Sequence, residues 1–166
     1  MIKFKVYFWK YLPKGYFKEI KRKYKDRLGD YMNVYICDTF EEMYNLADRL
    51  EKTKLKRNYA ARTLCFTRNF YEYATGKYIK TGPLCGYIYF NQENFYMDAV
   101  AHECSHAVIG YFGRKLKDCQ DFFVKTDEYG CLLDCPENEY IESEDKEELF
   151  CYMLGNIADQ IACKSK

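Results

Sequence analysis

The sequence feature that most constrains this chain is an H-E-x-x-H motif at residues 102–106. On an α-helix, residues four apart lie on the same face, so the imidazoles of His102 and His106 can point to one metal ion. Glu103 lies about 100° around the helix from His102, within reach of a water at that ion. Two neutral nitrogens and a free carboxylate are the groups that hold Zn²⁺ and take a proton from an activated water. The motif therefore predicts a zinc site.

His102 and His106 are the only histidines in the chain, and both belong to the motif. The alternative interpretation is a pair of ordinary surface histidines beside a surface glutamate. It is disfavoured because the opposite side of the helix is apolar, so we expect the histidines to face another part of the protein. The apolar residues on that opposite side are Val100, Cys104, Val108 and Tyr111.

A third histidine ligand is excluded. A metzincin continues H-E-x-x-H with a glycine and a third histidine, and this chain has Ile109 and Phe112 at those positions. The third protein ligand must therefore be a carboxylate or a thiolate from elsewhere in the chain.

Length and composition favour one domain spanning residues 1–166. No apolar run approaches the roughly 18 residues of a membrane span, so no membrane partner is expected. The N-terminus alternates apolar and basic residues and lacks the apolar core of a signal peptide. Nine cysteines without an export signal predict free thiols and a cytoplasmic location.

Charge divides this domain into two parts. Residues 1–82 hold 19 Lys and Arg against 9 Asp and Glu, a net +10, and residues 83–166 hold 7 against 16, a net −9. The densest basic segment, residues 18–27, is typical of the solvated face of a helix, and no nucleic-acid recognition motif accompanies it. We therefore regard a nucleic-acid partner as disfavoured, and we assign the metal site to the acidic part.

Hydrophobic periodicity predicts a mixed sheet with helices packed on it, an α+β fold. Thr39 and Glu42 form a capping box at a helix start. Residues 114–145 are polar with little periodicity and are expected to form a loop. In zinc peptidases, a strand shortly before the metal-motif helix commonly forms the upper edge of the cleft and pairs with an extended substrate, and residues 84–90 are expected to do so. The predicted strands are 2–8, 32–37, 62–67 and 84–90, and the predicted helices are 16–28, 39–50, 99–112 and 147–163.

The start of the last predicted helix, E-L-F-C-Y at residues 148–152, resembles the E-x-x-A-Y motif of small zincin-like proteins of bacteria and their phages. These include the ImmA/IrrE metallopeptidases, in which the motif follows H-E-x-x-H by a few tens of residues. The resemblance covers residues of about 84–113 and 145–160. It implies a zincin-like fold of gluzincin type, in which the C-terminal helix supplies Glu148 as the third zinc ligand.

Two other carboxylates compete with Glu148 for that role. The apolar stripe of the last helix is predicted at Cys151, Leu154 and Ala158. Glu147 lies nearer the centre of this stripe, which favours it as an inward ligand. Gly155 and the thin Cys151 would let another helix approach the Glu148 side closely, which favours Glu148. Asp127 lies in a stretch resembling an aspzincin element, but the spacing differs. We take Glu148 as the ligand.

The sequence thus predicts a zinc-dependent peptidase that acts on a peptide or protein substrate. Zn²⁺ is expected at His102, His106 and Glu148, with a water in the open fourth position. Glu103 is the expected general base. A tyrosine is the expected donor to the oxyanion, and the candidates are Tyr129 and Tyr152.

The alternative function is a binding or regulatory protein of zincin fold, of the kind encoded by phages and mobile elements. Such a protein would capture a host protein without turnover, and the charge-polarised surface would suit it. The complete motif argues against this alternative, because a pure binder has no use for Glu103.

Overall fold

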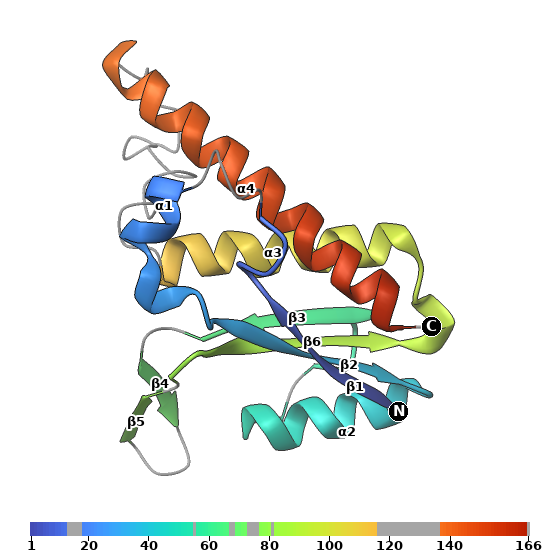
Figure 1. The fold of residues 1–166 in the computed structure, drawn as a ribbon. Helices are drawn as coiled ribbons and strands as arrows, with labels where there is room; N and C mark the ends of the chain where they lie inside the picture. The colour runs from blue at the N-terminus through green and yellow to red at the C-terminus, as the bar shows by residue number, and fades with distance from the viewer. Residues whose placement is uncertain are drawn as a thin grey trace.

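The computed structural model describes residues 1–12, 18–54, 56–66, 69–72, 77–80, 82–115 and 137–165, with the backbone alone for 19–21, 69–72, 77–80, 113–115 and 137–147. It is an α+β domain, as the sequence predicts. Helices α3 (Met97–Lys115) and α4 (Glu137–Lys164) lie on one face of a four-stranded sheet, and α2 (Phe40–Glu51) lies on the other (Figure 1). In this described part of the chain, no helix combines the length and apolarity needed to cross a bilayer.

The sheet has the strand order β1 (Ile2–Tyr7), β2 (Tyr31–Cys37), β6 (Leu84–Asn91), β3 (Ala61–Cys65). β2 and β6 pair in parallel, and the two outer pairs are antiparallel. β4 (Asn69–Glu72) and β5 (Lys77–Lys80) form a separate hairpin.

The expectation that residues 84–90 border the cleft and pair with an extended substrate does not fit the described sheet. They belong to β6, which pairs on both sides, and β3 takes the outer position beside α3. The physical reason is burial: Ile88, Tyr89 and Phe90 are all fully buried, which requires layers on both faces. β3 carries Arg62 and Thr63, polar residues that an edge strand tolerates.

The predicted helix over residues 16–28 is shorter in the structure. The described residues there form α1 (Lys18–Lys23) and then a 3₁₀ turn (Lys25–Arg27), and a second 3₁₀ turn (Gln92–Asn94) precedes α3. The capping box of α2 is confirmed, since Thr39 Oγ1 accepts from the Glu42 N–H at 3.2 Å.

α4 begins at Glu137, ten residues before the predicted start, so the acidic run after residue 136 is helix and not loop. Glutamates are strong helix formers, and acidic side chains interact favourably with the positive N-terminal end of a helix. The remainder of the predicted loop, residues 116–136, lies outside the described residues.

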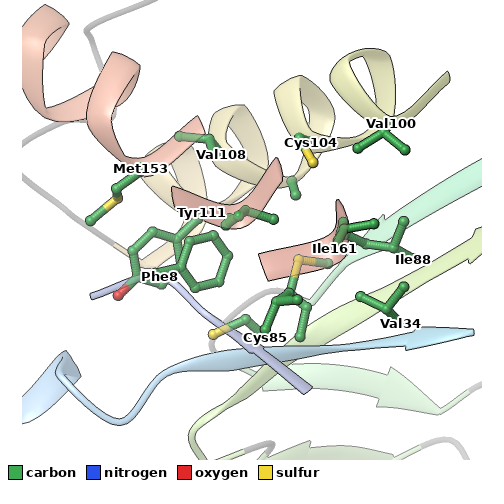
Figure 2. Close-up of a cluster of buried hydrophobic side chains, with 14 of the residues drawn as sticks. Phe8, Val34, Cys85, Ile88, Val100, Cys104, Val108, Tyr111, Met153 and Ile161 are labelled. Carbon is green, nitrogen blue, oxygen red and sulfur yellow. The ribbon is translucent and has the colours of Figure 1, made fainter. Parts of the chain in front are cut away.

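The main core lies between the sheet and the two helices α3 and α4 (Figure 2). The predicted apolar side of α3 is confirmed, since its four residues are at most 2 % exposed. The buried stripe of α4 is rotated from the prediction: Leu149, Met153, Ile157 and Ile161 are buried, and Cys151 is exposed.

Side chains of α4 cover the outer edge of β1. The Tyr7 N–H donates to Gln160 Oε1 at 3.0 Å, and the Tyr7 carbonyl accepts from Gln160 Nε2 and Asn156 Nδ2, both at 2.8 Å. Lys164 Nζ donates to the Lys5 carbonyl at 2.5 Å. The amide of Gln160 thus takes the place of a neighbouring strand, which protects this edge from pairing with another chain.

Candidate active site

The two histidines lie one turn apart on α3 with their rings in an edge-to-face contact. His102 Nε2 and His106 Nε2 are 3.1 Å apart, and the ring planes are inclined by 80°. Both side chains are exposed, so the expectation that they face another part of the protein is wrong for the described part of the chain. The cause is the helix period. The apolar residues on the opposite side of α3 pack into the core, so the histidines lie on its outer face.

The histidine pair fits a tetrahedral zinc ion. With Zn–N bonds of 2.0–2.1 Å, two ligand nitrogens on a tetrahedron lie about 3.3 Å apart, close to the observed separation. Without a metal, the same distance suits a hydrogen bond between two neutral imidazoles, one donating and one accepting. In either case the two nitrogens lie close together on the outer face of the helix.

Glu103 lies between α3 and β3 and is 5 % exposed. Its Oε2 accepts a hydrogen bond from Thr63 Oγ1 at 2.7 Å, and the same hydroxyl lies 3.0 Å from the Glu103 carbonyl oxygen. Glu103 and His106 are three residues apart, so they are neighbours on the helix surface. The carboxylate therefore sits on the strand side of the histidine pair.

A glycine allows the close approach of α3 to β3. A Cβ atom on Gly110 would lie 2.4 Å from Cys65 Sγ and 2.7 Å from Cys65 Cβ, which no real side chain tolerates. The Cys65 sulfur also lies 3.7 Å from the carbonyl oxygens of His106 and Ala107. Helix α3 thus packs directly on β3, and this packing brings the side chain of Glu103 into contact with Thr63.

The outer edge of β3 presents backbone groups beside this site. The Phe66 N–H donates to the Cys85 carbonyl at 2.7 Å, which fixes the alternation of the antiparallel pairing with β6. By that alternation, the N–H and C=O groups of Ala61, Thr63 and Cys65 point away from β6. No described strand pairs with this side of β3, whereas the outer edge of β1 is covered by α4.

Glu148 is not brought to the histidines. Its side chain is exposed, and Phe150, two residues later, packs against Phe112 with ring centroids 5.9 Å apart. Phe112 is six residues beyond His106, about 9 Å along the helix axis at 1.5 Å per residue. Within the described ranges, no group of three or more His, Cys, Asp or Glu side chains is placed to hold a metal ion.

The other candidates are only partly visible. The side chain of Glu147, and all of Asp127 and Tyr129, lie outside the described residues. Tyr152 is 43 % exposed on α4. Cys104 is fully buried on the core side of α3, opposite the histidines, so it is a packing residue.

Sequence reasoning missed Thr63. The strand that contains it was predicted, but the partner of that strand and its position beside the motif helix were not. The available signal was the hydroxyl of Thr63 on the same face of the predicted strand as Ala61 and Cys65, since a partly buried hydroxyl there needs a partner.

No protein-family model, curated protein or solved structure matches this chain.

Proposed function

We propose that this protein is a zinc-dependent peptidase of zincin-like fold. The observation that carries the proposal is the histidine pair, with Nε2 atoms 3.1 Å apart, on the helix that also holds Glu103 against β3, whose outer edge no described strand covers. In this proposal, these groups supply metal ligands, a base and a backbone surface for a peptide.

His102 and His106 would hold the zinc ion. The third ligand predicted from the sequence is Glu148, although the described part of the chain does not bring its side chain to the histidines. Zinc, when bound, supplies Lewis-acid activation of water and of the scissile carbonyl. Glu103 takes the proton of the attacking water and delivers it to the leaving amine. The outward backbone groups of β3 hold the substrate as an extended strand, and this main-chain pairing favours unfolded polypeptide as the substrate class.

The first test is the metal content of the purified protein by mass spectrometry. We expect one zinc per wild-type chain, loss of zinc in His102→Ala, and weaker binding in the variant that removes the third ligand. Glu147→Gln and Glu148→Gln compare the two candidates for that ligand. Glu93→Gln, which removes an exposed carboxylate shortly before α3, is the matched control and should retain the metal.

The second test is cleavage of a mixture of unstructured peptides by the zinc-loaded protein, followed by mass spectrometry. Glu103→Gln should retain zinc and lose cleavage. A chain that takes up no zinc under any loading condition contradicts the proposal, as does a Glu103→Gln variant that cleaves as well as the wild type. Zinc binding without cleavage of any peptide is the result that the alternative, a binding protein of this fold, predicts.

A further inference from the structure

The hydroxyl of Thr63 is the only hydrogen-bond donor seen at the Glu103 carboxylate among the described residues. The O···O distance of 2.7 Å is short, as expected when a hydroxyl donates to a carboxylate. The carbonyl of Glu103 lies 3.0 Å from the same oxygen, so one hydroxyl spans the side chain and the main chain of one residue. This arrangement restricts the rotamer of Glu103.

Thr63 has a second role through its backbone. It lies at the centre of β3, opposite Ile88 of β6, and its N–H and C=O point to the open side of the strand. Its β-branched side chain is stiff about the Cα–Cβ bond, so the position of its hydroxyl follows the position of the strand.

We propose that Thr63 is a positioning residue for Glu103, which couples the strand that binds the substrate to the base that acts on it. Its hydroxyl holds the carboxylate beside the histidine pair, while its main chain pairs with the incoming peptide. The catalytic part of this inference rests on the proposed peptidase function, whereas the contact between the two side chains does not.

The contact is tested without substrate by a double-mutant cycle on the metal-free protein. Thr63→Val keeps the shape of the side chain and removes the hydroxyl, and Glu103→Met removes the carboxylate. We expect Thr63→Val to raise the unfolding equilibrium constant about tenfold more in the wild-type background than in the Glu103→Met background, because a hydrogen bond to a charged group is lost only in the former. Equal effects in the two backgrounds overturn the contact.

The catalytic role is tested on the best-cleaved peptide of the mixture. Thr63→Val should lower kcat roughly tenfold to a hundredfold, the cost of a misplaced base, with KM and zinc content unchanged. Thr63→Ser, which restores a hydroxyl, should recover most of kcat. The same substitution at an exposed threonine, Thr53→Val, is the control and should leave both the kinetics and the stability as in the wild type.

The outcomes separate the two proposals. An active wild type whose kcat is unchanged in Thr63→Val overturns the positioning role and leaves the peptidase function standing. An inactive wild type overturns the peptidase function and the catalytic role of Thr63 with it, and the double-mutant cycle still decides whether the contact exists. A loss of zinc in Thr63→Val also overturns the inference, because Thr63 would then act through the metal ligands.

Discussion

Replacing Gln160 by methionine tests how the structure covers one edge of its sheet. Gln160 is 1 % exposed, and its amide pairs with both backbone groups of Tyr7. Methionine has a similar length and fills the same space with an apolar side chain. In the variant the Tyr7 carbonyl keeps the bond from Asn156, but the Tyr7 N–H loses its acceptor.

The expected cost follows from that single lost partner. A buried backbone donor left unsatisfied costs about 1–3 kcal/mol, and Tyr7 is only partly buried, so we take about 1–2 kcal/mol. That raises the unfolding equilibrium constant about 5–30-fold. For a chain of this size, it lowers Tm by about 2–8 °C.

Urea unfolding followed by tryptophan fluorescence measures this effect. Trp9 is the only tryptophan in the chain and is 5 % exposed in the folded protein, so its emission reports unfolding. Hydrogen exchange of the Tyr7 amide gives a local measurement, and we expect faster exchange in the variant. Cys151→Ala changes an exposed residue of the same helix and should stay within about 0.5 kcal/mol of the wild type. A Gln160→Met variant as stable as this control, with unchanged exchange at Tyr7, would refute the reasoning.

Two further predictions concern packing and pH. Gly110→Ala should destabilise the protein by about 1–3 kcal/mol in urea unfolding, because the new methyl group meets Cys65. Gly155→Ala, where a new methyl group has nothing within 4 Å, should stabilise α4 by about 0.5–1 kcal/mol. Equal effects of the two substitutions would refute the close approach of α3 to β3. Burial raises the pKa of the Cys37 thiol from 9.0 to about 11, so this proton is lost at lower pH from the unfolded chain than from the folded one. Ionisation of this thiol therefore does not change the free energy of unfolding below about pH 8 and lowers it as the pH rises from about 9 to 11. The decline in urea midpoint over that range should be shallower in Cys37→Ala, and an equal decline would contradict the assignment.

The α+β class and most of the elements follow from local sequence signals. Alternating residues mark β1, the Thr39 capping box marks the start of α2, and the apolar side of α3 is where the helical period places it. These features depend on neighbours within one or two turns or a few strand residues, and the sequence displays them directly.

Features that depend on distant pairing were not predictable in the same way. The apolar residues of β6 are equally compatible with an interior strand and with an edge strand whose faces are covered, and only the pairing with β2 and β3 decides. The burial of Leu149 and Met153, instead of Cys151, depends on which face of α4 packs against α3 and the sheet. The contact between Thr63 and Glu103 spans 40 residues and required the close approach that Gly110 allows.

The covering of β1 by α4 also has a consequence for protein synthesis. Gln160 follows Tyr7 by 153 residues, so the edge of β1 has no cover until α4 has emerged from the ribosome. The main core, which includes Met153 and Ile157, is also incomplete until then. Until α4 is available, a bare strand edge and apolar surface are exposed, and such surfaces make a partly folded chain prone to aggregation.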